Sequence, residues 1–184
     1  MIRSLTVFED VVKTICTTNC AWSATERMVG ALVEHLGEPV LGAPAAGPFG
    51  RTFPTPEAMA TASDAFYTDV VRAGYRGPYL RSLATSVAEG SLDLAGLEDP
   101  ALPDDEVERR LLALPGVGPY AAAHIMGIGL GRYSKLILDS WTRPKYASVS
   151  GGKPVADARI ARRFRRYGPY AGLAFWLTVT EDWA

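Results

Sequence analysis

The sequence has only two cysteines, Cys16 and Cys20, among its 184 residues. Two thiols are too few for a four-thiolate iron–sulfur cluster, a zinc finger or a disulfide framework. Long apolar runs are missing too, since no segment approaches the roughly 18 apolar residues that a membrane-spanning helix needs. The sequence therefore predicts an intracellular protein with no membrane partner.

An excess of positive charge is also missing. The chain has 19 Lys and Arg against 20 Asp and Glu, a net charge of −1, so overall attraction cannot argue for nucleic acid. Its composition, 48% hydrophobic and 21% charged, excludes a disordered or fibrous chain. The length allows about one hydrophobic core, so we predict a single domain over residues 1–184.

Strand signals are scarce, because no window alternates for long with β-branched residues. Apolar residues instead recur three and four apart from Phe8 to Leu36, which predicts one helix ended by Gly37. The segment from Glu38 to Pro56 is rich in Gly and Pro and predicts a loop. The other predicted helices span 56–63, 64–74, 77–90, 104–114, 119–131, 156–167 and 169–183. The predicted class is all-α, with two helical lobes folded as one unit.

Two of these helices, within about 104–131, are joined by Leu-Pro-Gly-Val-Gly and form a helical hairpin. Gly116 and Gly118 flank Val117, and both can take a positive φ or permit close approach of another backbone. We expect unpaired amides at Val117, Gly118 and the following helix start, where the helix dipole would attract phosphate. A tight turn with a glycine cap and no ligand would use the same residues.

The segment LPGVGPYAA, followed 21 residues after Gly118 by Asp139, resembles the helix-hairpin-helix DNA glycosylase superfamily (HhH-GPD). FEDVVKTICTTNCAW, AGYRGPYL and FRRYGPYAGLAFW resemble segments of 8-oxoguanine DNA glycosylases, so the likeness covers about Phe8 to Trp183. It implies the two-lobed helical fold of that superfamily. It also implies base excision repair, with damaged duplex DNA as partner. We expect a monomer located on DNA, in the cytoplasm or nucleoid.

By this resemblance, Asp139 is the catalytic carboxylate. Breaking an N-glycosidic bond leaves positive charge on the deoxyribose, so a fixed anion near C1′ lowers the barrier. Asp139 could instead cap a helix beginning at Ser140, although Pro144 would limit how such a helix continues. Tyr120 stands where bifunctional members carry the Lys that attacks the sugar. We therefore predict a monofunctional N-glycosylase without AP-lyase activity.

The resemblance also assigns contacts to the hairpin. Gly116, Val117 and Gly118 would grip one DNA phosphate through main-chain amides. A monovalent cation would bind the main chain at Gly116 and Gly118, and no other cofactor is expected.

Three more residues are assigned to base flipping. Asn19 would occupy the space vacated by the flipped base, while Tyr75 and Arg76 would probe the base left behind. Each has an ordinary alternative, because Asn19 could simply interrupt a helix, and Tyr75 and Arg76 could follow Gly74 in a turn.

The expected base pocket is aromatic and comprises Tyr120, His124, Trp141 and Phe175. Aromatic residues at helical spacing are more often core than site. Phe175 stands where 8-oxoguanine enzymes place a Gln that reads the base edge. Aromatic walls suit a positively charged alkylpurine, through stacking and cation–π attraction of about 0.5–2 kcal/mol. The predicted substrate is therefore an alkylpurine first, with 8-oxoguanine next.

A local basic tract lies near the C-terminus. Between Arg143 and Arg166 a single acid, Asp157, stands against eight basic residues: Arg143, Lys145, Lys153, Arg159, Arg162, Arg163, Arg165 and Arg166. A charge run usually marks a solvated helix face, but beside a phosphate-binding hairpin we expect contact with DNA backbone. The alternative function is a non-catalytic helix-hairpin-helix DNA-binding module, in which Asp139 merely caps a helix.

Overall fold

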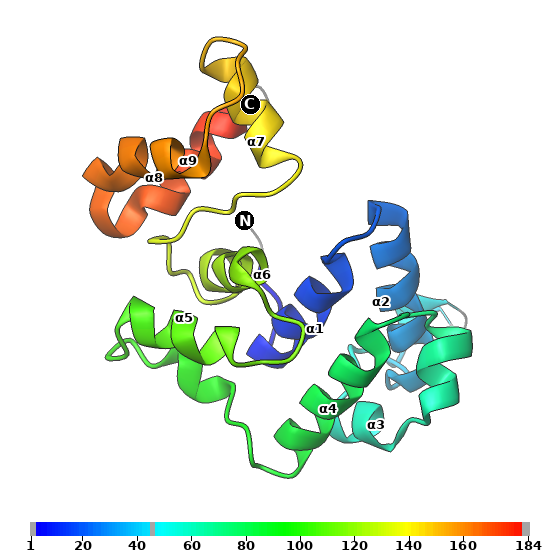
Figure 1. Ribbon diagram of the computed structural model, residues 1–184. Coiled ribbons are helices and arrows are strands. Elements are labelled where there is room, and N and C mark those ends of the chain that lie inside the picture. The colour runs from blue at the N-terminus through cyan, green and yellow to red at the C-terminus, as the bar shows by residue number, and fades with distance from the viewer. Residues whose placement is uncertain (1–2, 45–46, 182–184) are drawn as a thin grey trace. The chain divides into compact units, whose positions relative to one another are not determined.

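A computed structural model describes residues 3–44 and 47–181, so Trp183, in the last predicted helix, lies outside the described residues. The described chain is helical (Figure 1) and contains no strand, only an isolated bridge between Pro39 and Arg51. The predicted all-α class is confirmed. No helix in these ranges is long and apolar enough to cross a membrane.

The chain divides into two compact units. The N-terminal unit comprises Ser4–Asp99 and Ala113–Val117. The C-terminal unit comprises Pro100–Leu112 and the described chain from Gly118 onward, together with Arg3. That the two units act as one domain stays a prediction.

The N-terminal unit is built from four α-helices and three short helical turns. These are α1 (Val7–Thr17), α2 (Trp22–Leu36), η1 (Pro48–Gly50), α3 (Pro56–Thr61), η2 (Phe66–Val70), α4 (Arg76–Ala88) and η3 (Ala95–Glu98). Helix α1 packs against α2 and α4, and α3 packs against α4. The inward faces of α1, α2 and α4 supply fully buried apolar side chains such as Ile15, Leu32 and Leu80.

The single helix predicted from Phe8 to Leu36 is wrong, because α1 and α2 are separate. Asn19 lies between them with a φ of 47°, a left-handed conformation that a right-handed helix cannot contain. Gly37 does end α2 as predicted. A Cβ at Gly37 would lie 2.1 Å from the carbonyl oxygen of Thr52, so only glycine allows this close approach.

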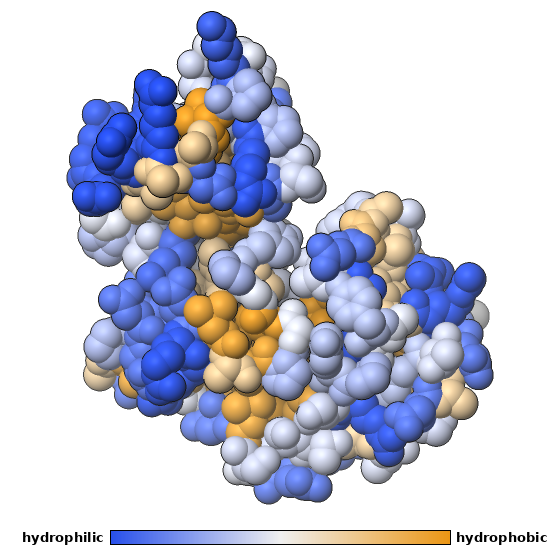
Figure 2. All heavy atoms as spheres, viewed as in Figure 1, coloured by the Kyte–Doolittle hydropathy of each residue, from blue (hydrophilic) through white to orange (hydrophobic). Residues whose placement is uncertain are grey.

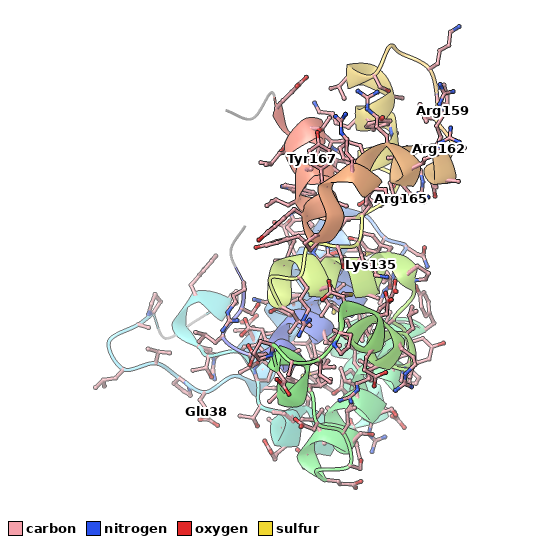
Figure 3. All side chains as sticks on the ribbon, turned by 90° about the vertical axis from the view of Figure 1, so that its left-hand side faces the viewer. Glu38, Lys135, Arg159, Arg162, Arg165 and Tyr167 are labelled. Atoms are coloured by element: carbon pink, nitrogen blue, oxygen red, sulfur yellow. The ribbon has the colours of Figure 1, made fainter. Side chains whose placement is uncertain are left out.

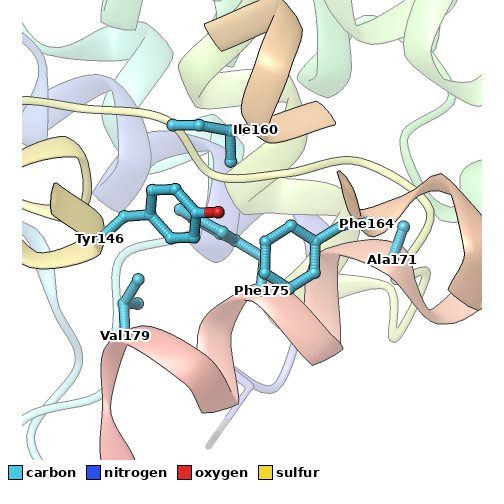
Figure 4. Packing of buried hydrophobic residues seen from close by; sticks show 6 residues of the cluster. All are labelled: Tyr146, Ile160, Phe164, Ala171, Phe175 and Val179. Carbon is cyan, nitrogen blue, oxygen red and sulfur yellow. The ribbon is translucent and has the colours of Figure 1, made fainter. Parts of the chain in front are cut away.

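The C-terminal unit contains α5 (Asp104–Leu112), α6 (Pro119–His124), η4 (Ile125–Gly129), α7 (Thr142–Val149), α8 (Asp157–Phe164), η5 (Arg165–Tyr170) and α9 (Ala171–Val179). Helices α7, α8 and α9 share one buried cluster (Figure 4), formed by Tyr146, Ile160, Phe164, Ala171, Phe175 and Val179. The rings of Phe164 and Phe175 meet edge to face with centroids 5.4 Å apart, a geometry that aromatic pairs favour.

Polar contacts and one close backbone approach hold the segment that follows η4. Arg132 donates to the carboxylate of Asp104 at 2.7 Å, and the Ser134 hydroxyl donates to the same carboxylate. From α9, Gly172 approaches this segment so closely that a Cβ would lie 2.1 Å from the carbonyl oxygen of Lys135. The residues that lead into α7 are therefore fixed from two sides.

Candidate active site and nucleic-acid interface

Asp139 is half-buried at the N-terminal end of α7. Its Oδ1 atom accepts the backbone N–H of Trp141 at 2.8 Å and that of Thr142 at 2.6 Å. The Thr142 hydroxyl in turn accepts the Asp139 amide at 2.9 Å, which makes a reciprocal cap. No residue in the described ranges donates a hydrogen bond to Oδ2. One carboxylate oxygen is thus anchored, and the other has no hydrogen bond within the described chain.

The existence of α7 corrects the expectation about Pro144. Pro144 is the third residue of α7, and the amides on either side of it, of Arg143 and Lys145, donate to the carbonyls of Asp139 and Trp141 at 3.3 and 3.2 Å. The ring therefore leaves one gap in this series of bonds, but the helix continues past it. Asp139 therefore does cap a helix. Capping and catalysis are compatible, because the hydrogen bonds of the cap fix the position of the carboxylate.

The hairpin link begins with a β-turn over Leu114–Val117. The Val117 amide donates to the Leu114 carbonyl at 3.1 Å. Pro115 and Gly116, with a φ of 84°, occupy the two central positions, as a type II turn requires. The expectation of an unpaired Val117 amide is wrong, because the turn uses that amide. The Val117 side chain is buried, so this residue serves the packing of the turn.

The two hairpin glycines differ. A Cβ at Gly116 would lie 2.9 Å from the Tyr79 ring, and its positive φ also favours glycine. Gly118 instead has a φ of −98°, so the expected positive φ is wrong there, and a Cβ would meet nothing within 4 Å. Gly118 is exposed and caps α6, and no acceptor in the described chain takes its amide. The fold therefore does not require glycine at 118.

The predicted monovalent cation would need main-chain carbonyl oxygens at Gly116 and Gly118. The Gly118 carbonyl accepts the Ala122 amide at 2.9 Å, and a carbonyl oxygen retains a second lone pair. Across the described ranges, no group of three or more His, Cys, Asp or Glu side chains could hold a metal. The monovalent cation at Gly116 and Gly118 stays a prediction.

The structure brings Asn19, Tyr75 and Arg76 together in the N-terminal unit. The Asn19 side-chain amide donates to the Tyr75 hydroxyl at 3.1 Å, and the Arg76 guanidinium donates to the backbone carbonyl of Thr18. The guanidinium also lies 4.5 Å from the Tyr75 ring. Hydrogen bonding to Thr18, and then to Asn19, lowers the pKa of the Tyr75 hydroxyl. Arg76 is buried whereas Tyr75 is 51% exposed, so Arg76 anchors the turn and Tyr75 faces solvent.

The four residues of the predicted base pocket fall into different environments. Tyr120 and His124 are neighbours on α6, with ring centroids 5.7 Å apart. Phe175 is fully buried in the core of the C-terminal unit, in contact with Tyr146 and Phe164. This burial corrects the expectation for Phe175, since its ring faces the core and is closed to a ligand.

Trp141 forms an aromatic pair that the sequence does not predict. The residue is 40% exposed, and its ring lies 6.0 Å, between centroids, from the ring of Trp176 on α9. Its backbone N–H is one of the two donors to Asp139. The pair therefore joins the anchored carboxylate to an aromatic surface within one unit.

Within the basic tract, Arg143 differs from the arginines of α8. Its Nε and Nη2 atoms donate to both carboxylate oxygens of Asp157, at 2.8 and 2.9 Å. Hydrogen bonding to Asp157 chiefly raises the pKa of Arg143, and the charge of Asp139 adds to the rise. Asp157, the one acid of the tract, is thus already paired with Arg143.

Comparison with known proteins shows similarity to DNA glycosylases. The chain is 25% identical over 190 residues to a probable N-glycosylase/DNA lyase from Methanothermobacter thermautotrophicus, covering 89% of this chain and 57% of that protein. An 8-oxoguanine glycosylase/lyase from Clostridium acetobutylicum, solved with double-stranded DNA, superposes with a TM-score of 0.79 and 22% identity over 98% of this chain and 61% of its own. A 3-methyladenine DNA glycosylase from Archaeoglobus fulgidus gives a TM-score of 0.69 and 21% identity over 98% and 60%.

These matches confirm the resemblance and the fold. The chain has the all-α fold of 8-oxoguanine and 3-methyladenine DNA glycosylases. No protein-family model matches it. The chain spans 57% of the length of the curated relative and about 60% of each solved structure.

Proposed function

We propose that this chain carries the catalytic helices of a DNA glycosylase of base excision repair, acting inside the cell as a monomer on damaged duplex DNA. The observation that carries the proposal is the anchored carboxylate of Asp139, held through Oδ1 by two backbone amides. This carboxylate lies in a glycosylase fold, beside the exposed residue Trp141. It is the fixed anion that cleavage of an N-glycosidic bond needs.

In the proposed reaction, the bond between C1′ and the purine nitrogen breaks, and its electron pair leaves with the base. Negative charge on Asp139 stabilises the positive charge that develops on the sugar. A water oxygen then bonds to C1′ and loses a proton to solvent. A cationic alkylpurine leaves as the neutral base without gaining a proton, whereas 8-oxoguanine leaves with a negative charge and gains one. Because Oδ1 is engaged by the cap, we assign Oδ2 as the oxygen that faces the sugar.

The product would be an abasic site with an intact strand. A strand-cleaving enzyme needs an amine that forms a Schiff base with the sugar, and Tyr120 occupies the position where the superfamily's lyases carry that Lys. Treatment with borohydride should therefore trap no covalent adduct. A trapped adduct would contradict the monofunctional part of the proposal.

An alkylpurine is the favoured lesion and 8-oxoguanine comes next. Phe175 cannot read a base edge by hydrogen bonding, and its ring lies in the core. The exposed Trp141, paired with Trp176, is an aromatic surface for a cationic alkylated base. Tyr75, presented by Arg76 and Asn19, would face the base that the flipped nucleotide leaves behind.

A base-release panel tests the activity. Duplexes carrying an alkylpurine, 8-oxoguanine or mispaired adenine are incubated with the protein and then cleaved with alkali at abasic sites. We expect cleavage of the alkylpurine duplex above all. Absence of abasic product from every duplex would refute the glycosylase proposal.

The competing function is a non-catalytic DNA-binding module, favoured by the observation that Asp139 caps α7. That function predicts salt-sensitive DNA binding by the wild-type protein without base release. It also predicts that replacing Asp139 lowers the stability of the fold and has no effect on base release, which is absent in the wild type.

A further inference from the structure

A strongly basic pocket lies at the end of α7 opposite to Asp139. Its volume is about 580 Å³, and its walls include Tyr146 and four cationic side chains, Lys153, Arg159, Arg162 and Arg163. Asp139 precedes the first turn of α7, whereas the pocket lining begins at Tyr146, in the last turn, and continues past the end of the helix. The two places therefore lie at opposite ends of α7, whose eight residues span about 12 Å.

In the described chain, no acid is paired with this charge. The pocket lining contains no carboxylate, and Asp157, the one acid of the tract, accepts two hydrogen bonds from Arg143. In the described part of the chain, no carboxylate forms an ion pair with any of the four pocket cations. All four are exposed, so the pocket carries four uncompensated positive charges on a chain whose net charge is −1.

The fold does not require these cations. Helix α8 packs inward through Ile160 and Phe164, which are buried, and its arginines stand on the outer face. Arg159 repels Arg162 and Arg163 across one helical turn, which opposes helix formation. Figure 2 shows the resulting hydrophilic cluster over α8, and Figure 3 shows Arg159, Arg162 and Arg165 along the same side. The repulsion between these arginines destabilises the helix, and no carboxylate of the described chain offsets it. This arrangement indicates that an anion from outside the chain binds here.

We propose that this pocket, hereafter the α8 pocket, binds phosphodiester groups of DNA that lie outside the lesion site. The planar guanidinium of arginine pairs with phosphate through two parallel hydrogen bonds, which lysine cannot match, and three of the four cations are arginines. The inference rests on DNA being the ligand, as proposed above, and is independent of catalysis at Asp139.

The α8 pocket would extend the DNA interface beyond the flipped nucleotide. Affinity for undamaged duplex should then rise with duplex length. Removing one cation that binds a phosphate should reduce the salt dependence of binding by about 0.9 in log–log slope. The rate of base release at saturating protein should be unaffected.

The test compares the full chain with Arg159→Gln/Arg163→Gln on lesion-free duplexes of two lengths, by fluorescence anisotropy at increasing salt. The matched control is Arg81→Gln/Arg109→Gln, which removes two arginines already paired with Asp64 and Glu106 at 2.6 and 2.7 Å. We expect the log–log slope of DNA affinity against salt concentration to fall by about 1.8 in the pocket variant and to stay unchanged in the control. The ratio of wild-type to pocket-variant affinity for DNA should therefore fall roughly 12-fold between 50 and 200 mM salt. Arg159→Lys/Arg163→Lys keeps the charge and should retain the slope.

Equal slopes for wild type and pocket variant, or an equal fall in the control, would overturn the proposal. Tripolyphosphate is the second probe. If it binds in an arginine-dependent way while the DNA slope stays unchanged, the ligand is a free polyphosphate and the DNA assignment is wrong. Base release is scored separately, so a protein that releases no base but shows the arginine-dependent slope refutes the glycosylase and supports the α8 pocket.

Discussion

Replacing Asp139 by asparagine separates its two roles, because asparagine keeps the capping oxygen and removes the charge. The Asn side chain can still accept the amides of Trp141 and Thr142, which Asp139 accepts at 2.8 and 2.6 Å. Asn and Asp rank together as helix caps. The loss is then at most the interaction of the charge with the helix dipole, about 0.3–1 kcal/mol.

Replacing Asp139 by alanine removes the cap as well. Loss of a capping side chain costs about 0.5–2 kcal/mol, and each kcal/mol lowers Tm by roughly 2–4 °C in a chain of this size. The chemical effect should be larger. Removal of one preorganised group that stabilises transition-state charge costs about 100- to 1,000-fold in rate, or about 2.7–4 kcal/mol.

The assays are thermal unfolding, DNA binding and single-turnover base release for wild type, Asp139→Asn and Asp139→Ala. We expect both variants to lose base release by at least about 100-fold, with the asparagine variant folded and still bound to DNA. If Asp139→Asn retains the wild-type rate, Asp139 is a cap alone and the proposed mechanism is wrong.

Three other predictions follow from local geometry. Gly116→Ala should destabilise the fold by about 1–2 kcal/mol because of its positive φ, whereas Gly118→Ala should leave Tm unchanged and weaken DNA binding; equal Tm losses would refute this contrast. Burial acts to raise the pKa of Asp104, but hydrogen bonds from Ser134 and Arg132 outweigh it and lower that pKa. Asp104 then stabilises the fold above its unfolded pKa of about 3.9, and this is lost as pH falls through the lower folded pKa. The stability gap between wild type and Asp104→Asn, from urea unfolding, should close at acid pH, and a constant gap would contradict the shift. Asp157→Asn should release Arg143 to compete for the charge of Asp139 and slow base release, and a second change, Arg143→Gln, should restore the rate.

The sequence predicts the helices best where caps and breaks agree with the apolar period. The hairpin helices illustrate this, since acids at Asp104 and Asp105 open one helix and Pro119 opens the next. It fails at Asn19, where apolar residues continue in register on both sides of a left-handed residue. It also misses α7, because Pro144 argues against a continuing helix, whereas α7 runs through Pro144 and tolerates the one missing amide.

The site is predicted less completely, for a related reason. Asp139 is recognisable from its spacing after the hairpin, but Trp176 is not, because α9 is apolar on nearly every side. In such a helix the pattern cannot tell which ring faces the core and which faces outward. Phe175 and Trp176 are adjacent, and packing against Tyr146 and Phe164 turns Phe175 inward. The half-buried ring of Trp176, which pairs with Trp141, is the one that the pattern does not single out.

The cap and the proposed chemistry at Asp139 depend on a division of labour between its two oxygens. Amides at the start of α7 neutralise part of the charge on Oδ1 and fix its position. The nearby guanidinium of Arg143 also carries a charge that interacts with Asp139, but its Nε and one Nη2 donor pair with Asp157. Asp157 thus shares the Arg143 charge with Asp139, and no donor in the described chain forms a hydrogen bond to Oδ2. An aspartate that served only as a cap would gain nothing from this arrangement, because pairing with Arg143 would leave the hydrogen bonds to Oδ1 intact.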